Sequence, residues 1–476
     1  MPEATARDPA VRSEDALAST ARAPDSTAAE PPPRAEPART GRGTARRSSW
    51  HVLSGREFRL YFTGSLVSNL GTWLQNTAQV LLAYQLTRSV FAVGLIASAQ
   101  FAGTLLVSPW AAVLADRIGR KATLISTQCA SALIAGAMAW RYAAGMLGEH
   151  SLVVGALGLG IAFSLALPVQ VALVPRLVDS KDAEAAMEMN SVSYNSGRAL
   201  APALCVLVLA FVGPGVVFAL NAISFVVFAV VLARLEPATS GAAATAPHAE
   251  ARSEPPRRAH ATDGIRIALH HQRLLLLLAI VAAVTLADDP ILVLSPALAH
   301  TGFHISSDWA GYFIAALGWG SVMGSVRPTV RSGVDVQRAS KRAARSLLAL
   351  GAAVIVFTAG VSPLISLLAA FAAGMAALFT GAAAQTAIVV RGQKSAASVA
   401  ALWAIAWAGT KPIASLLDGW LAGQVGILIT GILLAAPALL LALGELKIPD
   451  SSKRQIKNRA AQARMVHWIS SEPSRH

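Results

Sequence analysis

The sequence predicts an all-α integral membrane protein with about twelve transmembrane helices. Of its 476 residues, 54% are hydrophobic and only 14% are charged, whereas soluble proteins carry about 25% charged residues. Apolar stretches recur from Phe58 to Leu446, and each approaches the roughly 20 residues that a helix needs to cross a bilayer. Only helices and closed barrels span lipid, and these stretches are continuous rather than alternating, so helices are expected.

The expected spans fall into two sets of six. They lie near residues 58–83, 90–113, 122–142, 152–174, 188–212, 215–234, 274–298, 309–330, 343–361, 364–390, 396–421 and 426–444. Six spans, a polar linker and six further spans predict two pseudo-symmetric halves, an internal repeat typical of secondary transporters.

These spans define five regions of the chain. The first is rich in Ala, Pro and Arg without apolar periodicity, so we expect a disordered tail. The regions are the N-terminal tail 1–54, the first six-helix half 55–234, the linker 235–272, the second half 273–446 and a basic tail 447–476.

Basic residues gather in alternate loops. The rich set holds Arg117, Arg120, Lys121, Arg176, Lys181, Arg331, Arg338, Lys341, Arg342, Arg345, Arg391 and Lys394. The opposite set holds little beyond Arg88 and Arg141. Because short cytoplasmic loops are enriched in Lys and Arg, both termini are expected in the cytoplasm. The net charge of +14 is then a signal of topology, and no nucleic-acid partner is expected.

The loop after the second span reads AAVLADRIGRKAT, residues 111–123. Asp116 could cap a helix N-terminus, Gly119 permits a tight turn, and Lys121 could anchor the loop at the inner leaflet together with Arg120. The loop resembles the major facilitator superfamily pattern Gly-x-Leu-Ala-Asp-Arg-x-Gly-Arg-Lys. The matching residues are Asp116, Arg117, Gly119, Arg120 and Lys121, while Ala112 replaces the first glycine.

That resemblance implies a major facilitator fold and a conformational latch of the outward-facing state, with the aspartate at the start of a helix. The alternative is a positive-inside loop with no further role. The segment beginning FRLYFTGSLVSNLGTW, with NSVSYNSGRALAPAL (190–204) and RGQKSAASVAALWA (391–404), resembles the enterobactin-exporter-like branch, also called the transmembrane secretion effector group. The likeness covers residues 54–446.

Exporters of the superfamily often carry a Gly-x-x-x-Gly-Pro-x-x-Gly-Gly antiport motif in span 5. Gly197 and Pro202 match it, but Ala201, Cys205 and Val206 replace the other glycines. Small residues still allow close helix packing. The resemblance therefore implies export by antiport with a less tightly packed span 5.

Polar residues recur along span 1. Asn69, Thr72, Asn76 and Gln79 follow at i, i+3, i+7 and i+10, which places them on one helical face. The resemblance sets the first span of each half beside a central cavity, so this face is expected to line it. Alternatively, the four side chains hydrogen-bond neighbouring helices.

Span 5 carries Tyr194, Asn195 and Arg198 in its first half. Arg198 lies about ten residues into the helix, roughly 15 Å from its start, which is too deep for a loop charge. It is expected either to meet an anionic substrate or to pair with Tyr194, Asn195 or a carbonyl group.

The stretch AWAGTKPIASLLDGW (406–420) in span 11 contains Lys411 and Asp418, seven residues apart on one helical face. A lysine this deep needs a partner, and span 7 offers LADDPIL with Asp288 and Asp289. The implied architecture places these spans around the same half of the cavity, so an ion pair is predicted.

Successive helical residues point about 100° apart, so only one of the two aspartates is expected to face Lys411. Pro290 should kink the span. The pair could couple protons, with Asp418 on the same face, or could simply join two helices; a location at the external mouth is a third reading.

Three tryptophans, Trp319, Trp403 and Trp407, are further candidates for the cavity, where they could stack an aromatic substrate. No ATP-binding GxxxxGK[ST] loop occurs in the sequence, so a proton gradient is expected to supply the energy. No cofactor, metal site or catalytic residue is expected.

The sequence thus predicts a monomeric exporter in a bacterial inner membrane that works by alternating access. Its partners are the bilayer, protons and a small organic molecule such as a siderophore, drug or other metabolite. The alternatives are an importer or lysolipid-type transporter on the same fold, or a transport-inactive sensor.

Overall fold

The computed structural model describes residues 49–235, 272–326, 336–391 and 405–447. Within these ranges the chain has no strand and contains twelve α-helices of 16 to 32 residues. By length and composition, seven helical segments could cross a membrane, one of which, Ser180–Arg234, holds two helices. The expected all-α membrane fold is confirmed.

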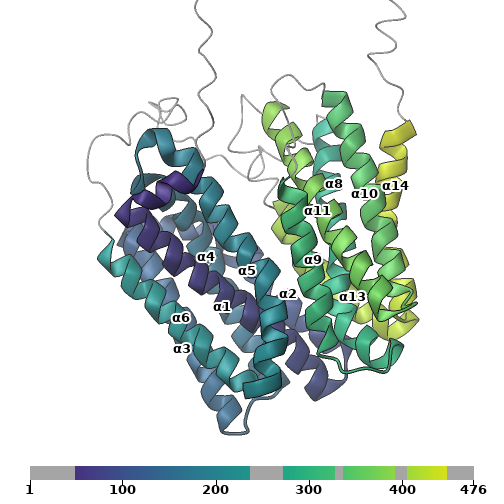
Figure 1. Cartoon of the computed structure of the whole chain (residues 1–476), viewed down its shortest axis with the longest axis horizontal. Coiled ribbons are helices and arrows are strands. Elements are labelled where there is room, and N and C mark those ends of the chain that lie inside the picture. Colours follow the sequence, from purple (N-terminus) through teal and green to yellow (C-terminus); the bar gives the residue numbers. More distant parts are fainter. Residues whose placement is uncertain (1–48, 236–271, 327–335, 392–404, 448–476) are drawn as a thin grey trace, which may run out of the picture. The chain divides into compact units, whose positions relative to one another are not determined.

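The first half consists of six helices, coloured purple to teal in Figure 1. They are α1 (Arg56–Thr87), α2 (Val90–Ile118), α3 (Arg120–Ala143), α4 (Glu149–Leu173), α5 (Ala183–Val212) and α6 (Pro214–Arg234). Within this half α1 packs on α5, α2 on α4, and α3 on α6. At the crossing of α2 and α4, a Cβ on Gly103 would lie 2.5 Å from the Gly160 carbonyl carbon, so the absence of side chains permits this contact.

The second half, green to yellow in Figure 1, repeats the arrangement. Its helices are α8 (Gln272–Ala297), α9 (Trp309–Val326), α10 (Val336–Thr358), α11 (Pro363–Arg391), α13 (Thr410–Val425) and α14 (Ile427–Lys447). A π-helical turn, Ile405–Gly409, leads into α13. Here α9 packs on α11, and α10 packs on α11 and α14.

The two halves contact each other through α2 with α13 and through α5 with α9. A Cβ on Gly94 of α2 would lie 2.3 Å from the Ser415 carbonyl oxygen, and one on Gly311 would lie 2.1 Å from Cγ2 of Val206. Gln85 at the end of α1 also donates a 2.9 Å hydrogen bond to Asp308 before α9. These residues lie toward the end where α1 stops and α2 begins, which we call the Arg88 end.

The last six residues of the expected tail, Ser49–Ser54, form a short 3-10 helix. Val52 is buried against the first half, and His51 Nε2 lies 2.9 Å from Asp182 Oδ1 just before α5. This contact holds the chain against the helices before α1 begins. Residues 1–48 lie outside the described part.

Candidate functional site

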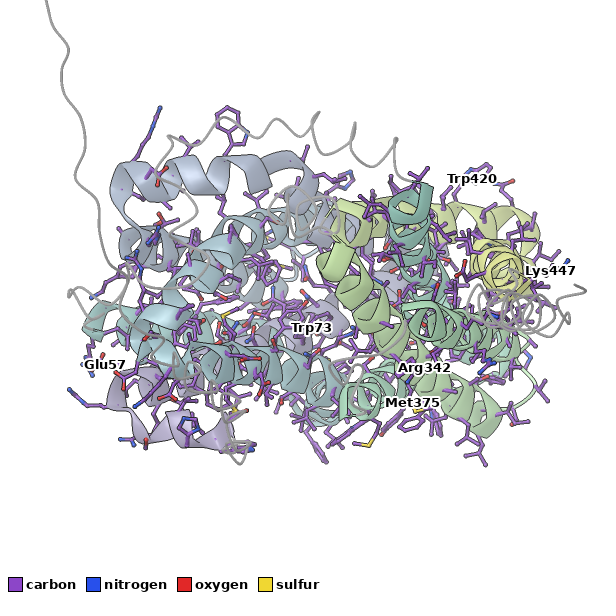
Figure 2. All side chains as sticks on the ribbon, turned by 90° about the horizontal axis from the view of Figure 1, so that it is seen from above. Glu57, Trp73, Arg342, Met375, Trp420 and Lys447 are labelled. Carbon is purple, nitrogen blue, oxygen red and sulfur yellow. The ribbon has the colours of Figure 1, made fainter. Side chains whose placement is uncertain are left out.

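A pocket between the halves contains three charged residues of the membrane region. Arg198 of α5, Asp288 of α8 and Lys411 of α13 line it. Four aromatic side chains also line it, and they are Trp73, Phe101, Tyr194 and Trp407. We call this the central pocket. Figure 2 shows Trp73 in the interior of the helix assembly, whereas Trp420, which is 54% exposed, lies at its edge.

Lys411 contacts both aspartates of α8. Its Nζ lies 3.2 Å from Asp288 Oδ1 and 2.7 Å from Asp289 Oδ1. The expectation that only one of these carboxylates could face Lys411 is therefore wrong. The two side chains do leave α8 in different directions, but the long lysine stem brings its ammonium group between them. A three-donor ammonium can bind both carboxylates at once.

Arg198 pairs with a residue that lies far from it in the sequence, and not with a neighbour in its own helix. Its Nη2 lies 3.4 Å from Asp288 Oδ2, and the two side chains are 20% and 10% exposed. Because Arg198 belongs to the first half and Asp288 to the second, this ion pair links the halves. Asp288 thus faces one cation from each half.

Asp289 of α8 is enclosed by the surrounding helices. It is fully buried, and its Oδ2 accepts a 2.5 Å hydrogen bond from Ser415 Oγ of α13. Asp418, also fully buried, is in none of the ion pairs of the described residues, and neither of its oxygens has a hydrogen-bond donor there. The ion pair expected for the aspartates therefore excludes Asp418.

Local backbone features lie beside these charges. Pro290 follows Asp289 inside α8 and cannot donate a backbone hydrogen bond, which leaves a helix carbonyl without its usual partner. The π-helical turn ends at Gly409, two residues before Lys411, and such turns are frequent at functional sites. Thr285 Oγ1 donates a 3.4 Å hydrogen bond to the Trp407 carbonyl of that turn, so α8 is tied to the turn that leads into α13.

Aromatic rings form one wall of the central pocket. Tyr194 meets Trp73 edge to face at 5.7 Å and stacks on Phe163 at 6.3 Å between centroids. Trp407, expected at the cavity, does line it. Trp73 and Phe101 were missed in the sequence because apolar spans contain many aromatic residues and nothing marks these two.

The polar face of α1 divides into two parts. Asn69, Thr72 and Asn76 line a second pocket that shares Trp73 and Tyr194 with the central pocket. Gln79 is instead fully buried and donates a 3.4 Å hydrogen bond to the Leu152 carbonyl of α4. Its expected place in the cavity wall is wrong, because α4 covers this face of α1 near the Arg88 end.

Three other candidates lie elsewhere. Trp319 of α9 is 43% exposed and does not line the central pocket. Asn195 donates to the Ser191 carbonyl of its own helix. Trp403 lies outside the described residues.

The loop 111–123 differs in detail from expectation. Asp116 lies in the last turn of α2 and is exposed; Gly119, with φ of +89°, occupies the N-cap position of α3. The proposed capping of α3 by Asp116 is therefore wrong, because α2 continues past Asp116 and the chain turns at Gly119. Lys121 donates to the carbonyls of Ala233 and Leu235, at 2.7 and 2.8 Å. Its ammonium is thus held by the C-terminus of α6 and is not free to reach lipid.

The sequence of the chain matches the model of one protein family. Residues 47–471 match the family model described as transmembrane secretion effector. No curated protein sequence matches the chain.

Solved structures show the same fold at low sequence identity. A mutant of the nucleoside transporter NupG aligns with a TM-score of 0.63 and 11% identity, covering 81% of this chain and 99% of that one. A D-xylose-proton symporter gives 0.57 and 16%, covering 82% and 98%. An inward-facing, unoccupied bacterial homologue of the human lysosomal transporter Spinster gives 0.55 and 12%, covering 84% and 95%.

Proposed function

Because the chain belongs to the transmembrane secretion effector family of the major facilitator superfamily, we propose that it exports a small organic molecule across the bacterial inner membrane in exchange for protons. Membrane transport and this fold are supported by the family and by the similar solved structures. The direction, the substrate and the coupling ion are our proposal.

The observation that carries the proposal is the charge cluster at the central pocket. Lys411 and Arg198 meet Asp288 beside four aromatic side chains. Ionisable groups inside a membrane are costly and typically mark substrate or ion pathways. An amphipathic molecule with an aromatic ring and an anionic group would match the rings and the two cations.

The proposed coupling step is an exchange of partners. When a proton neutralises one of the aspartates around Lys411, the lysine is held less strongly by the carboxyl groups and becomes able to bind a substrate anion. When the proton leaves, the ion pair forms again and displaces the anion. Arg198 extends this exchange to the other half, since it shares Asp288 with Lys411.

Alternating access requires that the halves close at one end and open at the other. The close helix contacts at Gly94 and Gly311 lie toward the Arg88 end. With both termini in the cytoplasm, that end faces outward, and the described state is the inward-facing one. Asp116 then belongs to a latch that is released in this state, which fits its exposed position without any hydrogen bond or ion pair to a described residue.

Transport into inverted membrane vesicles tests the proposal. A panel of siderophores, drugs and other metabolites is offered with and without an imposed proton gradient, and the Lys411→Met variant is the control for carrier-independent uptake. We expect gradient-driven accumulation of at least one aromatic anion by the wild type only. Uptake in right-side-out vesicles would indicate an importer, and no gradient-dependent movement of any compound would favour a sensor.

A further inference from the structure

We propose that Asp289 and Asp418 share one proton, in a buried carboxyl pair separated from the central pocket by Lys411. This inference deepens the proposed function, because it names where the coupling proton resides and separates that place from the substrate-facing Asp288.

The first observation is the environment of Asp418. Its side chain is fully buried, yet no donor in the described residues reaches either carboxyl oxygen. An ionised carboxylate in that position would be a buried charge with no compensating hydrogen bond, which is one of the costliest arrangements in a protein. A protonated carboxyl removes the charge and supplies a donor.

The second observation is the position of Asp289. Asp289 contacts Lys411 and Ser415 of α13, and Asp418 lies on the same face of α13, about one turn beyond Ser415. The carboxyl groups of Asp418 and Asp289 are thereby neighbours, and a hydrogen bond can form between them. Two ionised carboxylates are acceptors only, so this bond requires that one of them carries a proton. Neighbouring carboxyl groups that cannot both ionise hold a proton between them.

The third observation is the balance of charge. The ionisable groups around Asp418 are Asp289 and Asp288 on α8 and Lys411 on its own helix. Arg198 joins the cluster from α5 through Asp288. Tyr194, also on α5, lines the pocket beside them. Three carboxyl groups therefore face two cations, and one excess negative charge remains when every carboxyl is ionised. A single proton makes the cluster neutral.

The contacts of Asp289 assign this proton to the Asp418 side of the pair. Lys411 Nζ lies 2.7 Å from Asp289 Oδ1, and Ser415 donates a hydrogen bond to Asp289 Oδ2. Asp289 is thereby stabilised as the ionised partner, and Asp418 is left to carry the proton.

The pair also lies apart from the substrate side. Asp288, Arg198 and Lys411 line the central pocket, whereas Asp289 and Asp418 do not and are fully buried. Lys411 contacts both aspartates of α8 and stands between the two places. Loss of the shared proton would add a negative charge behind Lys411 and draw its ammonium away from the pocket.

Infrared spectroscopy of the purified full-length protein tests the pair without any transported substrate. At neutral pH we expect the C=O stretching band of one buried carboxylic acid, shifted on transfer to D2O. Asp418→Asn should abolish the band, Asp418→Glu should keep it at a changed frequency, and the control Asp179→Asn, which removes an exposed carboxylate outside the cluster, should keep it unchanged. The glutamate variant preserves the test if the asparagine variant does not fold.

Two outcomes would overturn the inference: no such band in the wild type, or a band that persists in Asp418→Asn. Loss of the band on adding sodium at constant pH would also overturn it, since a cation would then replace the proton. If the band is present but transport does not depend on the proton gradient, the proposed antiport is wrong, whereas the shared proton is still supported.

Discussion

Arg198 and Asp288 join the two halves of the protein at the level of the central pocket, with Nη2 of the arginine 3.4 Å from Oδ2 of the aspartate. Arg198 projects from α5, and the neighbouring turns of α5 pack closely on α9, where a Cβ on Gly318 would lie 2.6 Å from the Cα of Ala199. The ion pair and the helix crossing are therefore adjacent. The charged pocket and the contact that holds the two halves together therefore share this part of the structure.

Replacing Arg198 with Gln should weaken the link between the halves. A hydrogen bond to a charged group contributes about 1.5–3 kcal/mol, so the ratio of the state closed at the Arg88 end to the open state should fall about tenfold or more. Spin labels on α5 and α9 would measure the separation of the halves. Arg198→Lys keeps the charge and should have a smaller effect. An unchanged distance distribution in Arg198→Gln would show that helix packing alone holds this contact.

Replacing Lys411 with Met should destabilise the protein strongly. The change leaves Asp288 with Arg198 only and removes the cation from Asp289, and breaking a buried pair typically costs about 3–5 kcal/mol. The double variant Lys411→Met with Asp289→Asn removes both charges and should recover much of the loss. Melting of the detergent-solubilised protein measures both effects. Additive losses in the double variant would contradict direct coupling between the two residues.

The sequence predicted the helices well because membrane spans need long apolar runs. Span 7 was expected at 274–298 and α8 covers Gln272–Ala297, while span 10 was expected at 364–390 and α11 covers Pro363–Arg391. Lys411 and the aspartates of α8 were visible for the same reason, since a charge in an apolar run stands out and needs a partner.

The features that the sequence could not predict depend on how deep a side chain lies in the helix bundle and on which neighbouring helix it faces. Gln79 shares a helical face with Asn69, but α4 covers that face only near the Arg88 end. The partner of Arg198 lies 90 residues away in the other half, which local periodicity cannot reveal. Ser415 is an ordinary small residue in the sequence, and nothing there indicates its hydrogen bond to Asp289.

Replacing Lys121 with Met should destabilise the first half. Its ammonium donates to two carbonyls at the end of α6, where a positive charge is also favoured by the helix dipole. We expect a loss of about 1–3 kcal/mol and a lower melting temperature. Arg120→Met removes an equal charge next to it from an exposed side chain and is the control. Equal melting temperatures for the two variants would show that the carbonyl contacts contribute nothing.

Replacing Asp116 with Asn should reduce transport and leave the described state intact. The side chain is exposed at the end of α2, so the melting temperature should not change. If the proposed latch forms in the opposite state, the variant should lower the rate of exchange in vesicles. Asp179→Asn, an exposed carboxylate in the loop between α4 and α5, is the control. Wild-type rates in Asp116→Asn would refute the latch.

Replacing Gly419 with Leu should force the halves apart at the Arg88 end. A Cβ at this position would lie 2.9 Å from both the Phe91 Cα and the Val90 carbonyl oxygen of α2, and backbone atoms cannot turn aside as a side chain can. Overpacking of this kind costs about 1–3 kcal/mol, enough to lower the ratio of the closed to the open state about tenfold.

The labelling rate of Cys205 reports that opening once the exposed Cys129 has been changed to Ser. Cys205 is fully buried in a cluster that also contains Val293 of α8, so separation of the halves should expose its thiol to a maleimide. Gly423→Leu, one turn further along α13, has open space around its Cβ and should label as slowly as the wild type. Because the two variants add the same side chain to the same helix, faster labelling in Gly419→Leu alone can come only from the contact with α2. Equal labelling rates in both would mean that this crossing does not hold the halves closed.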